Sequence, residues 1–81
     1  MDSLKNAVVK RFKQLCDERK IKPNTLANIA GVTPSTVYSL FDEGRNSVQL
    51  RTVKTLCDGL EITLAEFFTA KVFDELEQEV R

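Results

Sequence analysis

Residues 23–41 constrain the fold of this 81-residue chain more than any other stretch, because they carry the signals for two short helices joined by a sharp reversal. Gly31 lies at the reversal, where a residue without a Cβ adopts a positive φ at no steric cost. Thr33 offers a side-chain oxygen as the cap of the second helix, and Pro34 follows at the first helical position, where its missing N–H is not needed. We therefore predict one helix before Gly31 and another from Pro34 to about Asp42.

The apolar positions of this stretch allow the two helices to pack closely. In the first helix they are Leu26, Ala27, Ile29 and Ala30. In the second helix they are Val37, Leu40 and Phe41, with the i, i+3, i+4 spacing of a single face. Because Ala27 is small, the second helix can cross the first at short range. This combination is typical of the helix-turn-helix motif, whose second helix enters the major groove of DNA.

The flanking sequence predicts further helices, so the chain reads as all-α. Residues 4–19, residues 48–58 and the segment that Thr63 and Glu66 open as a capping box all show apolar positions at helical spacing. We expect these apolar positions to be buried: Leu4, Val8, Phe12, Leu15 and Cys16, then Leu50, Val53, Leu56 and Cys57, then Leu64, Phe67 and Phe68.

The last segment, residues 70–81, also follows a helical pattern and predicts an amphipathic extension of a domain formed by residues 1–69. Its apolar stripe consists of Val72, Phe73, Leu76 and Val80, and the remaining positions are mostly acidic. The pattern leaves open whether this helix continues the preceding one or turns away near Thr69. The stripe is a candidate contact between two copies of the chain; the alternative is that it folds back onto the first helix of its own chain.

Composition limits the classes of function. The chain has no histidine, and Cys16 and Cys57 lie far apart among helix-periodic apolar residues, so we interpret both as buried, reduced side chains rather than metal ligands or nucleophiles. A short chain without a Gly-rich phosphate loop argues against an enzyme, and nothing indicates a cofactor or a small-molecule ligand. No apolar run is long enough to span a bilayer and no signal-peptide pattern opens the chain, so we expect a cytoplasmic protein without membrane contact.

The net charge of zero conceals an uneven distribution. Residues 1–22 hold seven Lys/Arg and three Asp/Glu, whereas residues 59–81 hold two Lys/Arg and six Asp/Glu. A basic front and an acidic tail fit DNA on one side and a different contact on the other. The same division also fits two solvated helix faces, so charge alone decides neither reading.

Regular spacing of apolar and small residues extends well beyond the two-helix motif. The positions concerned are Phe12, Leu15, Ile21, Leu26, Ala27, Ala30, Gly31, Val32, Thr33, Val37, Leu40, Gly44, Leu50, Val53, Leu56, Cys57, Leu60, Ile62, Glu66, Phe67 and Phe68. Over residues 8–68 this pattern resembles the Cro/C1-type helix-turn-helix family, also called the XRE family. The resemblance implies a five-helix, lambda-repressor-like domain whose second and third helices form the motif, and a transcriptional regulator that binds double-stranded DNA. Because one such domain makes a small interface, a homodimer on two half-sites is the expected assembly.

The sequence departs from the family pattern in two places. Pro23 stands where the family often has a phosphate-binding Gln. Cys16 and Phe41 stand where the family often has a buried Arg–Glu pair, and replacing both members of such a pair by apolar groups is compatible with the fold. We therefore expect Cys16 and Phe41 to lie in or near contact.

The expected DNA contacts divide into two sets. Base contacts are expected from the exposed positions around the start of the third helix, which are Thr33, Pro34, Ser35, Thr36, Tyr38 and Ser39. Phosphate contacts are expected from the start of the second helix and from the loop after the third, which supply Asn24, Thr25, Arg45, Asn46 and Ser47. Two alternatives stay open. The polar positions could be a plain solvated face, or the domain could be a protein-binding module, antitoxin-like or an accessory regulator, whose C-terminal helix holds a partner.

Overall fold

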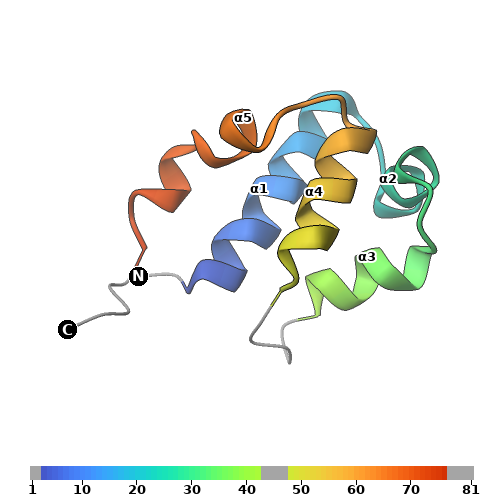
Figure 1. Ribbon diagram of the computed structural model, residues 1–81, viewed down its shortest axis with the longest axis horizontal. Coiled ribbons are helices and arrows are strands. Elements are labelled where there is room, and N and C mark those ends of the chain that lie inside the picture. The colour runs from blue at the N-terminus through green and yellow to red at the C-terminus, as the bar shows by residue number, and fades with distance from the viewer. Residues whose placement is uncertain (1–2, 43–47, 77–81) are drawn as a thin grey trace.

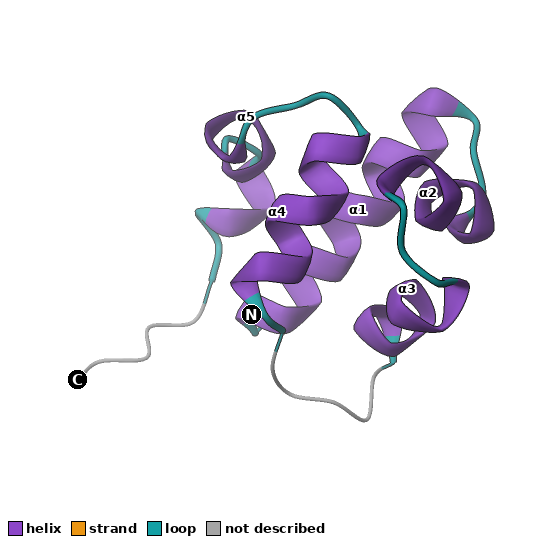
Figure 2. Ribbon diagram, turned by 45° about the vertical axis from the view of Figure 1, so that its right-hand side comes forward, coloured by secondary structure: helices purple, strands orange, loops and turns teal. Residues whose placement is uncertain are grey.

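The computed structural model describes residues 3–42 and 48–76, and within these ranges it contains helices and no strand. The elements in chain order are α1 (Leu4–Arg19), α2 (Pro23–Ala30), α3 (Pro34–Phe41), α4 (Leu50–Gly59), α5 (Leu64–Phe68) and the 3-10 helix η1 (Lys71–Phe73). α1 and α4 lie side by side at the centre, with α2 and α3 at one end and α5 at the other (Figures 1 and 2). The prediction of an all-α domain with five α-helices is confirmed.

The helix boundaries follow local signals in the sequence. The Ser3 hydroxyl accepts a hydrogen bond from the first turn of α1 at 3.3 Å. Thr63 and Glu66 form the predicted capping box of α5, with both hydrogen bonds at 3.0 Å. Gly31 ends α2 with φ +74°, the left-handed conformation that the reversal requires. The local chemistry of these termini therefore decides where the helices begin and end.

A single hydrophobic core joins all five α-helices. Its buried members are Val8, Phe12, Leu15, Cys16, Leu26, Ala27, Val37, Leu40, Val53, Leu56, Cys57, Leu60 and Phe67. Phe12 of α1 and Phe67 of α5 are fully buried, with their ring centroids 4.5 Å apart. The Arg11 guanidinium adds two hydrogen bonds to the end of α5, from Nε to the Phe67 carbonyl at 2.8 Å and from Nη2 to the Glu66 carbonyl at 3.0 Å. Together these contacts attach α5 to α1.

Four residues that the spacing assigns to apolar helix faces lie at the surface. Leu4, Ile29, Leu50 and Phe68 are 45%, 49%, 64% and 37% exposed. Each is one of the first or last two residues of its helix. Helical periodicity assigns these positions to the apolar face, but the elements packed against that face leave their side chains partly uncovered. The predictions that Leu4, Leu50 and Phe68 are buried are therefore wrong, for a reason that lies in the tertiary packing.

The C-terminal segment does not form the predicted amphipathic α-helix over residues 71–76. Ala70 is extended, with ψ 143°, and the short η1 follows it before the chain enters a turn. The Phe73 ring lies 5.6 Å from that of Phe67 and 4.8 Å from that of Phe68, and η1 packs against α1. The segment after α5 therefore packs its Phe73 ring onto α5 and η1 onto α1 instead of continuing as an α-helix. Of the alternatives left open, the chain turns away after α5 and folds back on itself; Val80 lies outside the described residues.

Both cysteines are buried and free, as predicted. Burial raises the pKa of the Cys57 thiol to about 11 and also raises the pKa of the Cys16 thiol, so both remain protonated at neutral pH. Over the ranges that the structure describes, no group of three or more His, Cys, Asp or Glu side chains is placed to hold a metal ion. Nor does any helix in those ranges have the length and apolar character needed to cross a bilayer.

α2 and α4 approach each other closely at Gly59, and this contact makes a prediction about stability. A Cβ at Gly59 would lie 2.7 Å from the Ala30 Cα and 3.0 Å from the Ala30 backbone nitrogen, so α2 and α4 would have to separate. Gly59→Ala should lower the free energy of unfolding by about 1–3 kcal/mol in urea titrations. Gly31→Ala serves as a comparison, since open space surrounds it but φ is positive. Asn should be better tolerated than Ala at Gly31 and worse at Gly59; the same order at both sites would contradict the steric explanation.

The raised pKa of Cys57 predicts a dependence of stability on pH. The unfolded thiol ionises near its ordinary value of 9.0, whereas the folded thiol keeps its proton until about pH 11. Between these values the unfolded state binds fewer protons, so the free energy of unfolding should fall as the pH rises from 9 to 11. Cys57→Ala should reduce this decline in urea titrations at a series of pH values. An unchanged decline in the variant would show that other groups cause it.

Candidate nucleic-acid interface

The turn between α2 and α3 holds the two helices in a defined relation. The Val32 N–H donates to the Ala27 carbonyl at 3.0 Å and the Gly31 N–H to the Asn28 carbonyl at 3.3 Å, which closes the turn after α2. Ala27 of α2 and Val37 of α3 are both fully buried. Since α2 packs against both α3 and α4, it fixes the direction of α3 relative to the rest of the domain.

The face of α3 that points away from the core carries the predicted base-contact residues. Thr33, Pro34, Ser35 and Tyr38 are exposed, and Thr36 and Ser39 are half-exposed. All six are therefore open to solvent on α3 and its N-cap, and Tyr38, at 53% exposure, is the largest group among them. We call these six residues the reading face.

Two hydrogen bonds connect three hydroxyl groups of the reading face. Thr33 Oγ1 lies 2.9 Å from Ser35 Oγ and 3.1 Å from Thr36 Oγ1. Thr33 is the N-cap of α3 as predicted, but its side chain makes no capping hydrogen bond to the backbone. The prediction of a side-chain cap is wrong in that respect, because Thr33 Oγ1 forms its hydrogen bonds with the neighbouring hydroxyl groups instead.

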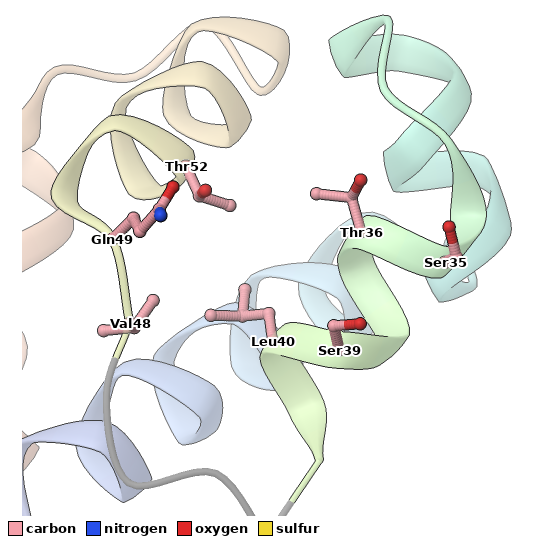
Figure 3. A pocket seen from close by; sticks show the side chains of 7 residues that line it. All are labelled: Ser35, Thr36, Ser39, Leu40, Val48, Gln49 and Thr52. Atoms are coloured by element: carbon pink, nitrogen blue, oxygen red, sulfur yellow. The ribbon is translucent and has the colours of Figure 1, made fainter.

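A groove runs beside the reading face, between α3 and the start of α4 (Figure 3). Its volume is about 350 Å³, and its lining consists of Ser35, Thr36, Ser39, Leu40, Val48, Gln49 and Thr52. We call it the α3–α4 groove. All of its lining residues are uncharged; Leu40 and Val48 form its apolar part, and the Gln49 and Thr52 side chains extend toward α3 from the opposite wall. Sequence reasoning missed Gln49 and Thr52, since no local pattern shows that the start of α4 lies beside α3.

The predicted phosphate-contact residues are only partly described. Asn24 and Thr25 are exposed in the first turn of α2, and Lys22, the N-cap, makes no side-chain capping bond. Backbone N–H groups at such a terminus favour an anion, so this end of α2 suits a phosphate. Arg45, Asn46 and Ser47 lie outside the described residues.

A second groove, of about 440 Å³, lies between α1 and the end of α3, and basic residues of α1 line much of it. Lys13 Nζ lies 5.8 Å from the centroid of the Phe41 ring. The buried Lys5 side chain donates from Nζ to the Asp42 carbonyl at 3.0 Å, which ties the end of α3 to α1. Phe41 packs against the core that contains Cys16, so both residues belong to one cluster; a direct contact between them stays a prediction.

The chain belongs to the Cro/C1-type helix-turn-helix DNA-binding domain family, whose model matches residues 11–72. This range includes α2, α3, α4 and α5 entirely and most of α1. The resemblance that the sequence suggested is therefore confirmed, and in general terms the protein is a DNA-binding transcription regulator. No curated protein and no solved structure gives a significant match.

Proposed function

We propose that the protein is a sequence-specific transcription regulator that places α3 in the major groove of double-stranded DNA. The reading face carries this proposal, because it is the exposed side of the second helix of the motif, held outward by α2. In this proposal the base contacts come from Thr33, Pro34, Ser35, Thr36, Tyr38 and Ser39. The phosphate contacts come from Asn24, Thr25, Arg45, Asn46 and Ser47. In this proposal the protein acts in the cytoplasm, where it has access to double-stranded DNA.

Affinity and base discrimination come from different parts of the protein in this proposal. The segment from Thr33 to Phe41 carries no charge, so it attracts the phosphate backbone weakly. Seven of the twelve Lys and Arg residues lie within residues 1–22, and they supply most of the favourable electrostatic potential. Binding should therefore depend steeply on salt even though the reading face is neutral.

We further propose that the protein acts as a homodimer. One α3 of eight residues offers few base contacts, and two-fold dimers solve this by placing two recognition helices about 34 Å apart. The proposed contact is the C-terminal stripe of Val72, Phe73, Leu76 and Val80. Val72 and Phe73 are half-buried within their own chain and so keep part of their surface for a partner. Phe68, which is exposed and in ring contact with Phe73, enlarges the apolar area.

A protein-binding module of the same fold is the second candidate. Its support is the exposed acidic pair Asp74 and Glu75, which follows directly on η1 and would suit a basic partner. In that case the C-terminal segment would hold an antitoxin-like or accessory complex together, and α3 would not contact DNA.

Placing a negative charge on the reading face tests the DNA proposal. Ser35→Glu introduces a carboxylate at the second position of α3, where it would enter the negative potential of the major groove. Gel-shift titrations of the full chain on random-sequence duplex should show affinity that falls steeply between about 50 and 200 mM salt. The variant should bind at least about tenfold more weakly at the lower salt.

Ala65→Glu provides the matched control, since Ala65 is exposed at the second position of α5, far from the reading face. It should bind as the wild type does. An equal loss in both variants would contradict the placement of DNA on α3. Absence of binding at either salt concentration would favour the protein-binding module.

The dimer contact has its own test. Leu76→Glu puts a charge into the apolar stripe at a half-buried position outside the main core. Sedimentation of the full chain should show a dimer for the wild type and for Asn28→Glu, which places the same charge at an exposed site of α2 at the other end of the domain, and a shift of the Leu76 variant toward monomer. Undiminished self-association of the Leu76 variant would remove this stripe as the interface.

A further inference from the structure

The side chains from Thr33 to Phe41 exclude the two strongest forms of direct base reading. None of them carries a charge or a carboxamide. Arg and Lys recognise guanine through N7 and O6, and Asn and Gln recognise adenine through paired hydrogen bonds. α3 itself instead presents hydroxyl oxygens, methyl groups and the Tyr38 ring. Its base preference must therefore arise from a combination of weaker contacts.

The bonded hydroxyls make the reading face rich in acceptors. Thr33, Ser35 and Thr36 together hold three hydroxyl protons and six lone pairs. The two hydrogen bonds among them use two of the protons and two of the lone pairs, which leaves one donor and four acceptor positions. A guanine edge shows only acceptors in the major groove and so pairs poorly with this surface. Adenine N6 and cytosine N4 are donors there and pair well.

The α3–α4 groove adds an apolar receptor beside these hydroxyls. Figure 3 shows carbon atoms of Thr36 and Leu40 directed into the space between α3 and the start of α4, with Val48 on the opposite wall. The groove contains no charge and has room for a methyl group. Thymine is the DNA base whose major-groove edge carries a methyl group, at C5. The groove and the hydroxyl cluster share Ser35 and Thr36, so one base pair can meet both.

We propose that the reading face selects A·T pairs, with the thymine C5-methyl group in the α3–α4 groove and the adenine N6 amino group donating to the hydroxyl cluster. This inference rests on the proposed DNA-binding function and adds the class of sequence that the domain recognises. In this proposal Thr36 has two roles: its hydroxyl belongs to the acceptor cluster, and its methyl group lines the groove. It also predicts that discrimination depends on methyl groups more than on charged contacts.

Uracil substitution tests the methyl contact directly. Duplexes selected by the full chain from a random pool should carry A·T pairs at the positions that face α3. Replacing one such thymine by deoxyuridine removes only the C5-methyl group and leaves every hydrogen-bonding group in place. The Kd, measured by fluorescence anisotropy, should rise about fourfold for each critical thymine, as expected for the loss of one buried methyl-sized group.

A double cycle with Thr36→Ser connects the effect to this residue. The substitution removes the Thr36 methyl group and keeps its hydroxyl, so the thymine and uracil duplexes should then bind with Kd values within about twofold of each other. Thr69→Ser is the matched control. Thr69 is exposed after α5, and serine preserves the hydrogen bond that its hydroxyl donates to the Glu66 carbonyl at 2.7 Å. This control should keep the full difference between thymine and uracil.

A 5-methylcytosine arm separates the methyl group from the base pair that carries it. A 5-methylcytosine·guanine pair in place of thymine·adenine restores the methyl group but puts guanine acceptors near the hydroxyl cluster. Its Kd should lie between those of the thymine duplex and the unmethylated cytosine duplex. Binding as tight as thymine would overturn the assignment to A·T pairs, as would selection of G·C pairs facing α3.

Two outcomes distinguish failure of this inference from failure of the proposed function. Equal binding of thymine and uracil duplexes by the wild type would overturn the inference while leaving DNA binding intact. If Gln49→Ala then weakened all duplexes alike, the α3–α4 groove would be assigned to the sugar–phosphate backbone. Absence of binding to any duplex would overturn both proposals.

Discussion

The contact of α2 with α4 at Ala30 and Gly59 is the constraint on which the functional surface depends. There is no space for a Cβ at Gly59, so the two helices meet backbone to backbone. α2 in turn packs on α3 through Ala27 and Val37, both fully buried. The orientation of α3 therefore depends on the packing of α2 against α4. Small residues, Gly59 and Ala30 in one contact and Ala27 in the other, allow both pairs of helices to approach closely. Close packing of this kind transmits displacement, so a shift of α2 would move the reading face as well.

The other end of the domain is held by a different set of interactions. The Phe12 and Phe67 rings form the buried contact, and the Arg11 guanidinium satisfies two carbonyls at the end of α5. Helix C-termini leave carbonyl groups without intrahelical partners, and a cationic side chain is a favourable donor to them. The Phe73 ring then covers Phe67 and Phe68. None of these contacts involves a residue of the reading face, so the attachment of α5 does not depend on the side chains proposed to contact DNA.

The chemistry of the two surfaces follows from this separation. The reading face and the α3–α4 groove are uncharged and offer hydroxyls and methyl groups, whereas basic residues collect on and beside α1. Long-range attraction to a polyanion depends on charge and carries no sequence information, while short-range contacts to base edges do. A domain built in this way can attract DNA with one part and discriminate bases with another.

The sequence by itself determined the five α-helices, the reversal at Gly31, the capping box of α5, the buried cysteines and the family, because each depends on neighbours within a few residues or on periodic spacing. The tertiary structure decided the exposure of Leu4, Ile29, Leu50 and Phe68, the fold-back of η1, the anchoring part of Arg11, and the position of Gln49 and Thr52 beside α3. Periodicity defines which side of a helix is apolar, but it contains no information on how far a partner helix extends or which distant segment lies opposite. Only the packed chain brings the start of α4 to the flank of α3, and so only the packed chain forms the groove.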